Sequence, residues 1–175
     1  MDIERFERLY RDHAPRLFSF LAYRTGDSVL AEDLLADVFE RALRSRGRFD
    51  PRKAAETTWL YAIAVNRLRD HARQAAVRGR AVDRLDLEDS SAGEEEHVAL
   101  RDEVQRALGA LSPDERETIS LRFGADLTTR QIAKVVGERE TTVDGRLYRS
   151  LRKLRTELEG RDRGTAAGEP RSTPR

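Results

Sequence analysis

The sequence from Thr128 to Arg155, TTRQIAKVVGERETTVDGRLYRSLRKLR, holds two amphipathic segments joined by one short corner. Apolar residues share one helical face of the first segment, namely Ile132, Ala133 and Val136. In the second segment, Val143 and Leu147 form the corresponding apolar face. Gly137 can adopt the left-handed conformation that ends a helix. The spacing predicts a helix-turn-helix, in which the small Ala133 side chain allows the two helices to cross closely.

The outer side of the second predicted helix is rich in arginine. It presents these residues to solvent or to a groove: Thr142, Gly145, Arg146, Arg149 and Arg152. Such a helix fits the major groove of DNA, with its N-terminal residues at base edges and its arginines at phosphates. The alternative is a solvated helical hairpin with extended arginine side chains.

Length and composition narrow the possibilities. The chain has 175 residues, which is room for one ordinary domain or two small ones. No apolar run approaches the roughly 20 residues of a membrane span, and the N-terminus lacks the apolar stretch of a signal peptide. We therefore expect a cytoplasmic protein without membrane insertion. With no cysteine, disulfides and thiolate metal sites are excluded.

The net charge of +1 is a sum of opposites. Residues 51–84 hold eight basic and three acidic residues, and residues 128–155 hold the same numbers. Between them, residues 85–103 hold eight acidic residues and one basic residue. Two basic blocks therefore flank an acidic one, and these local fields govern binding more than the total charge does.

The first half of the chain reads as helices. Helical spacing runs from Ile3 to Leu21, with an expected break or kink at Pro15. A second helix is expected from Leu30 to Arg44. Thr57 or Thr58 is expected to cap a third, which runs from Trp59 to Gln74. Aromatic and polar residues fall together on one face of this third helix: Trp59, Ala62, Asn66 and Arg73.

Periodicity stops at Arg78 and resumes near Val98, so we expect a flexible acidic linker over residues 78–97. The second half then carries two helix starts with capping boxes, Ser112 with Glu115 and Thr128 with Gln131. Thr141 is expected to cap the last helix. Its predicted inner face is Leu147, Leu151 and Leu154. Residues 160–175 read as a disordered tail.

Three ordered stretches together resemble the extracytoplasmic-function (ECF) sigma factors of bacterial RNA polymerase. ALGALSPDERETISLRFGADLTTRQIAKVVGERETTVDGRLYRSLRKLR (residues 107–155) is similar to their fourth region. AEDLLADVFERALR (31–44) and TTWLYAIAVNRLRDHAR (57–73) resemble their second region. The resemblance implies an all-α protein of two small domains. Residues 1–77 would be region 2, residues 78–97 the linker and residues 98–159 the helix-turn-helix region 4.

The resemblance implies that region 2 opens the promoter at the minus-ten element. That task needs a pocket for an extruded base and cations for the backbone. Phe49, Tyr61 and Asn66 would line the pocket, with Trp59 on the same helix face, although packing in a core is the alternative for Trp59 and Tyr61. The cations expected to hold DNA are Arg48, Arg52, Lys53, Arg67, Arg69 and Arg73.

The resemblance also implies a surface for core RNA polymerase on the helix that contains residues 31–44. Asp33, Ala36, Asp37 and Glu40 would form it, although a solvated acidic face is the simpler interpretation. The family usually has Gln where this chain has Ala36. One polar contact to polymerase is therefore expected to be missing.

Region 4 would bind the minus-thirty-five element through a defined set of residues: Arg130, Thr141, Thr142, Asp144, Gly145, Arg146, Arg149 and Arg152. The family often has Lys then Ser where this chain has Asp144 and Gly145. A carboxylate repels phosphate but can accept a hydrogen bond from cytosine N4. We therefore expect an unusual minus-thirty-five sequence.

The resemblance further implies control by an anti-sigma protein, with no cofactor and no covalent chemistry. The three histidines have no metal-ligand spacing, and no phosphate loop or nucleophile motif appears, so an enzyme is disfavoured. Two alternatives stay open. One is a helix-turn-helix regulator that acts without polymerase, and the other is an interaction adaptor on a degenerate sigma fold.

Overall fold

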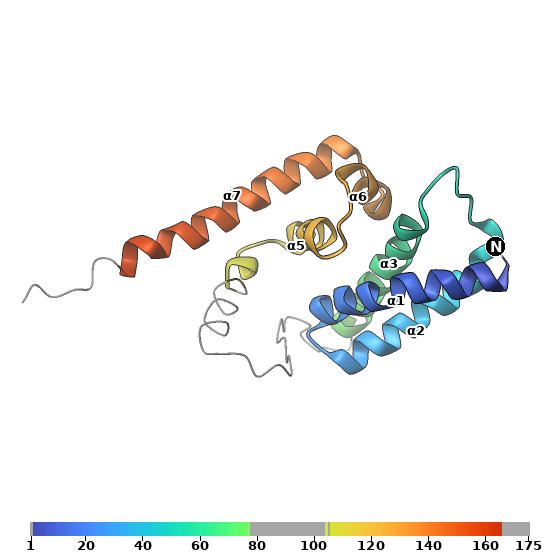
Figure 1. Ribbon diagram of the computed structural model, residues 1–175. Helices are drawn as coiled ribbons and strands as arrows, with labels where there is room; N and C mark the ends of the chain where they lie inside the picture. Colours follow the sequence, from blue (N-terminus) through green and yellow to red (C-terminus); the bar gives the residue numbers. More distant parts are fainter. Residues whose placement is uncertain (1, 78–103, 105, 166–175) are drawn as a thin grey trace, which may run out of the picture.

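The computed structural model describes residues 2–77, 104 and 106–165, and these residues form helices and connecting loops without a strand (Figure 1). The predicted acidic linker and residues 166–175 of the predicted tail lie outside them. The elements are α1 (Ile3–Thr25), α2 (Ser28–Ser45), the 3₁₀-helix η1 (Arg46–Arg48), α3 (Glu56–Val77), α5 (Pro113–Ile119), the π-helical turn η2 (Ser120–Gly124), α6 (Thr129–Val136) and α7 (Glu140–Thr165).

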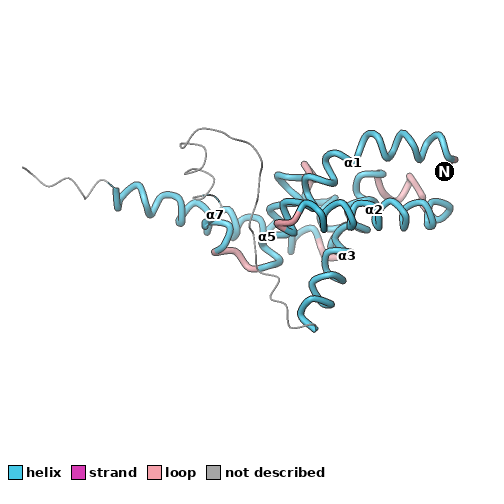
Figure 2. The backbone as a smooth tube through the Cα atoms, turned by 90° about the horizontal axis from the view of Figure 1, so that it is seen from below, coloured by secondary structure: helices cyan, strands magenta, loops and turns pink. Residues whose placement is uncertain are grey.

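Helices α1, α2 and α3 pack together as the first domain. The Asp2 side chain caps α1, Gly26 ends it at a φ of 65°, and Asp27 caps α2 one residue later. This tight connection turns the chain back, so that α1 and α2 lie side by side (Figure 2). Apolar residues from all three helices form the core, including Leu17, Leu21, Val38, Leu60 and Val65.

Of the break or kink expected at Pro15, the break does not occur, because α1 continues through this residue to Thr25. A proline in a helix removes one backbone hydrogen bond and costs about 3 kcal/mol. Here Pro15 is exposed, while Leu9 and Leu17 on either side of it are buried. Packing of both halves of α1 against the same core therefore outweighs the local cost.

The second domain is built on the capping boxes that the sequence predicts. Ser112 and Glu115 exchange side-chain and backbone hydrogen bonds at the start of α5, and Thr128 and Gln131 do so at the start of α6. Gly137 ends α6 with a φ of 76°, as expected. These two predictions of helix starts and one of a helix end are confirmed.

Helix α7 differs from expectation at both ends and along its inner face. It begins at Glu140 rather than after Thr141, and it extends to Thr165, past the predicted end at Glu159. Val143 and Ser150 are fully buried, whereas Leu151 is 42% exposed. The inner face follows residues 143, 147, 150 and 154, a spacing of four, three and four, so Leu151 falls beside it. The prediction of Leu151 as an inner residue was wrong.

The two domains pack on each other through α3 and α6 (Figure 1). One cluster of buried side chains continues from α1, α2 and α3 into residues of the second domain, among them Leu127, Ile132 and Val143. Two polar contacts also cross the boundary between the domains. Arg69 of α3 pairs with Glu117 of α5, and Lys134 Nζ of α6 donates a hydrogen bond to the Lys53 carbonyl at 2.8 Å. No helix among the described residues is long and apolar enough to cross a membrane.

Candidate nucleic-acid interfaces

The loop between α2 and α3 brings an aromatic pair to the surface of the first domain. The rings of Phe49 and Trp59 lie 4.8 Å apart between centroids, tilted by 33°, and both are half-buried. Arg48, Arg52 and Lys53 lie exposed in the same segment. Stacked rings beside cations are a surface on which an unpaired base can stack while its phosphates are held.

Tyr61 was expected beside Phe49, but it is a core residue. Its ring packs edge-on against Phe20, with 5.1 Å between the centroids, and the residue is 2% exposed. Burial raises the pKa of Tyr61 to about 12. Around the helix, position 61 falls between the fully buried positions 64 and 65 of α3, which explains why its side chain faces inward. Asn66 is exposed, as a surface role requires.

The arginines of α3 are held in ion pairs. Arg67 bonds to Asp37 of α2 and lies 3.6 Å from Asp70, and Arg73 also pairs with Asp70. Arg69 donates to Glu117 at 2.6 Å. Each of the three cations expected to hold upstream DNA is therefore paired with a carboxylate in this structure. Of the three, Arg73 is the most exposed.

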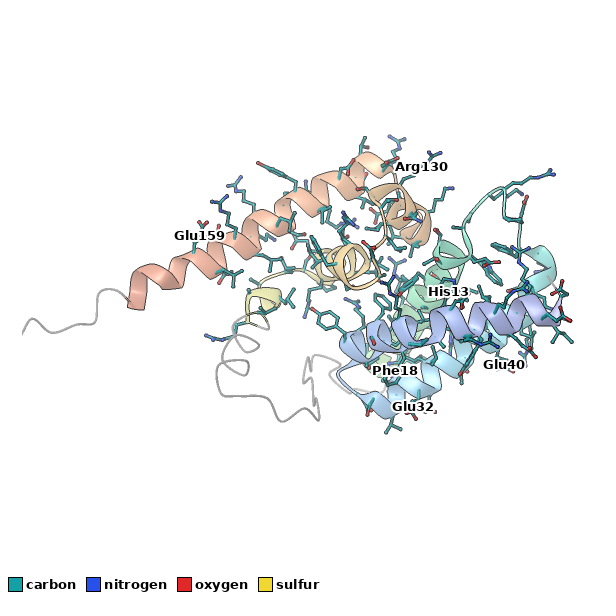
Figure 3. The ribbon with its side chains drawn as sticks, viewed as in Figure 1. His13, Phe18, Glu32, Glu40, Arg130 and Glu159 are labelled. Carbon is teal, nitrogen blue, oxygen red and sulfur yellow. The ribbon has the colours of Figure 1, made fainter. Side chains whose placement is uncertain are left out.

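Helix α2 displays the expected acidic face. Asp33, Ala36 and Glu40 are exposed, and Glu40 pairs with Arg44 one turn later. Asp37 is half-buried and ties α2 to α3 through Arg67, so part of its role is structural. Figure 3 labels Glu40 on α2 and Arg130 at the start of α6, far apart in the view.

Helices α6 and α7 form the predicted helix-turn-helix. The residues expected at DNA are exposed at five positions of α7 and one of α6: Arg130, Thr141, Thr142, Asp144, Arg149 and Arg152. Gly145 is half-buried, and a Cβ atom placed on it would lie 3.3 Å from Arg149 Nη1. Arg149 thus folds back along α7 over the glycine one turn earlier.

Arg146 does not point into a groove as expected. Its guanidinium donates to both carboxylate oxygens of Glu138, at 2.7 and 2.8 Å, and to Thr118 Oγ1 of α5 at 3.4 Å. The side chain is 13% exposed. Position 146 follows the buried Val143 by three residues, so its side chain starts toward the domain interior.

Two functional candidates were missed in the sequence. Tyr148 is 70% exposed on α7, one residue before Arg149, and adds an aromatic ring to the helix-turn-helix surface. Glu138, in the turn after α6, is the second, because it is the partner of Arg146. An aromatic residue within an arginine-rich helix was the available signal for Tyr148. Nothing in the local pattern marks Glu138.

Comparisons with known proteins agree with this architecture. The chain matches the family model described as Sigma-70 region 2 over residues 9–78, and that described as Sigma-70, region 4 over residues 101–154. It is 34% identical to RNA polymerase sigma factor CarQ of Myxococcus xanthus, over 86% of this chain and 87% of CarQ. It is 32% identical to ECF RNA polymerase sigma factor BldN of Streptomyces coelicolor, over 87% of this chain but 60% of BldN.

A solved structure shows the same fold. The chain superposes with a TM-score of 0.71 on the sigma factor RpoE of Bartonella quintana, determined in complex with the anti-sigma factor NepR, at 22% identity over 90% of this chain and 98% of that one. Regions 2 and 4 in this order define a subunit that starts transcription rather than an enzyme. The chain belongs to the ECF sigma factors of bacterial RNA polymerase. It directs promoter-specific initiation.

Proposed function

We propose that this sigma factor divides promoter recognition between α3 with its preceding loop and α7. The observation that carries the proposal is that each element presents exposed cations next to groups able to touch bases. The boundaries proposed for the two modules are residues 1–77 and 98–159, and the family-model matches at 9–78 and 101–154 support them. Binding energy alone drives strand opening, so the protein needs no catalytic group.

At the minus-ten element, the Phe49–Trp59 pair stacks with an unpaired base and Asn66 contacts a base edge. Base stacking on aromatic rings contributes about 1–3 kcal/mol per base. Arg48, Arg52 and Lys53 hold the single strand, and Arg73 holds the duplex upstream. Arg67 and Arg69 also bind DNA phosphates, after they release the carboxylates with which they pair in this structure.

At the minus-thirty-five element, the first two turns of α7 enter the major groove. Thr141, Thr142 and Asp144 lie exposed there, with Arg130 and Arg152 placed for phosphates. Asp144 selects cytosine through its N4 amino group. The substitution Asp144→Lys, measured on promoters that differ at single minus-thirty-five positions, changes which base is preferred; an unchanged preference removes Asp144 from recognition.

The exposed face of α2 docks on core RNA polymerase through Asp33, Ala36 and Glu40. The site of action is the cytoplasm, where polymerase is found. An anti-sigma protein controls access, a proposal supported by the NepR complex of the RpoE relative. Removing the α2 carboxylates by Asp33→Asn and Glu40→Gln weakens polymerase binding, and an unchanged affinity assigns these residues to a solvated face.

Run-off transcription tests the proposal as a whole. Purified core polymerase, this protein and genomic fragments are combined, and the start sites are mapped. Discrete starts that share two upstream elements support it. DNA binding without transcripts supports a regulator that acts without polymerase, and absence of both supports an adaptor.

A further inference from the structure

Two arginines one turn apart on α7 have opposite surroundings. Arg146 is almost enclosed and bonded to Glu138 and Thr118, as described above. Arg149 is exposed and lies over Gly145. The sequence pattern alone treats the two residues alike, since both belong to the arginine-rich side of the same helix.

The contacts of Arg146 join three parts of the second domain. Its side chain starts on α7, reaches Glu138 in the turn after α6, and touches Thr118 near the end of α5. Thr118 is fully buried, and so is Ser150, whose hydroxyl donates to the Arg146 carbonyl at 2.8 Å. Moving Arg146 onto DNA would break these contacts and leave the Glu138 carboxylate facing phosphate.

Gly145 has the opposite effect on Arg149. Without a Cβ atom at position 145, the Arg149 side chain can lie along the helix toward its N-terminal end, where a recognition helix meets base edges. A guanidinium in that place can bind the O6 and N7 atoms of guanine with two hydrogen bonds.

We infer that α7 assigns different tasks to its two arginines. Arg146, held by Glu138, is a positioning residue that sets the recognition helix against α5 and α6, and Arg149 over Gly145 is the arginine that reads a base of the minus-thirty-five element. This inference rests on the proposed function, because it takes α7 to be the helix that enters the groove.

The substitution Glu138→Ala separates the two roles of Arg146 by the sign of its effect. If Arg146 positions the helix, losing its partner weakens promoter binding by about tenfold. If Arg146 binds phosphate and Glu138 merely offsets its charge, losing the carboxylate tightens binding instead. Glu157→Ala is the matched control, since it removes an exposed carboxylate from α7 outside the two turns proposed to enter the groove, and we expect a change of no more than about twofold.

The measurement is the affinity of holoenzyme for the fragment that gives the strongest run-off transcript, taken over a range of salt concentrations. Arg146→Met lowers the affinity for the promoter fragment without changing its salt dependence. The double variant Glu138→Ala/Arg146→Met binds the fragment at least as tightly as whichever single variant binds it less tightly. Arg149→Ala removes a discrimination of about tenfold at one minus-thirty-five position. Melting curves establish that each variant is folded, and Glu138→Gln replaces any Glu138 variant that is not.

Several results overturn the inference. They are tighter or unchanged binding by Glu138→Ala, a salt slope lowered by about one in Arg146→Met, and base preferences unaltered in Arg149→Ala. If wild-type holoenzyme ignores every base change in the minus-thirty-five region, the proposed function of α7 fails, and that result is distinct from the others.

Discussion

Arg69 of α3 donates a hydrogen bond across the domain boundary to the carboxylate of Glu117, with 2.6 Å between Nη2 and Oε1. Glu117 is 5% exposed, and the half-buried Arg24 lies close enough to interact with it electrostatically. Burial lowers the pKa of Arg24, and Glu117 partly offsets that effect. An anion enclosed among cations thus connects region 2 to region 4.

The substitution Glu117→Gln is expected to loosen this domain packing, because a neutral amide leaves the surrounding arginines without a counter-charge. The chain has no cysteine, so spin labels can be placed at Glu32→Cys in α2 and Glu140→Cys in α7. We expect a broader and longer distance distribution in the Glu117→Gln background. Glu7→Gln, a neutralisation at an exposed site on α1, serves as the control. An unchanged distribution for Glu117→Gln would show that the ion pair does not hold the domains together.

Tyr61→Phe separates packing from base recognition. The Tyr61 hydroxyl is buried without a hydrogen-bond partner, so removing it should leave stability unchanged or raise it by about 1 kcal/mol. Because the ring faces the core, run-off transcription should keep its wild-type level. Chemical unfolding and transcription are measured on the same preparation. A loss of transcription with unaltered stability would restore Tyr61 to the base pocket.

The ion pair between Glu115 and Lys153 predicts a pH dependence. Lys153 donates to Glu115 at 2.8 Å, and this bond, with the Ser112 backbone N–H, lowers the pKa of Glu115 below its ordinary value of 4.5. A lowered folded pKa stabilises the protein above the unfolded value, and that contribution is lost as pH falls through the folded pKa. The Tm difference between wild type and Glu115→Gln should therefore shrink from neutral pH to pH ~3. A constant difference would contradict this.

Ala36→Gln tests the surface of α2. Ala36 is exposed between two acidic residues, and a glutamine there supplies a donor and an acceptor. One added hydrogen bond corresponds to a gain of about 2- to 10-fold in affinity for core polymerase. Ala72→Gln, at an exposed position on α3, is the matched control. Equal affinities for the two variants would place the docking surface elsewhere.

Gly145→Ala is expected to stabilise region 4 and alter recognition at once. Alanine favours the helix over glycine by about 1 kcal/mol. The new Cβ atom would meet Arg149 Nη1 at 3.3 Å, so this flexible side chain has to shift. A higher Tm with weaker discrimination at the base that Arg149 contacts is the expected pair of results. A higher Tm with unaltered discrimination would show that Arg149 acts independently of the glycine.

Local sequence signals predicted the helices and several of their ends. The capping boxes at Ser112 and Thr128 were readable because each depends on residues three apart in the chain. The continuity of α1 through Pro15 could not be predicted from local sequence, because the cost of the proline is outweighed only by packing against helices distant in the chain. Leu151 and Tyr61 were misplaced for a related reason. Both are apolar enough for a core or a surface, and tertiary contacts decide which.

The candidate site was predicted in outline, and the partners of its charges were not. The positions of the exposed residues Asn66, Asp144 and Arg152 follow from helical spacing. The pairing of Arg146 with Glu138 spans a turn, and that of Arg69 with Glu117 spans two domains, so no spacing rule indicates either one. Resemblance to a family located the two surfaces; it did not show which cations are already engaged.

The packing of α3 against α6 also bears on the distance between the two promoter elements that the protein has to reach. The centres of the minus-ten and minus-thirty-five elements are roughly 25 base pairs apart, which is about 85 Å of B-form helix. The domains that carry the reading helices α3 and α7 pack on each other here, so the arrangement described belongs to the protein off its promoter. Helices α3 and α7 therefore have to separate before one molecule can bind both elements at once.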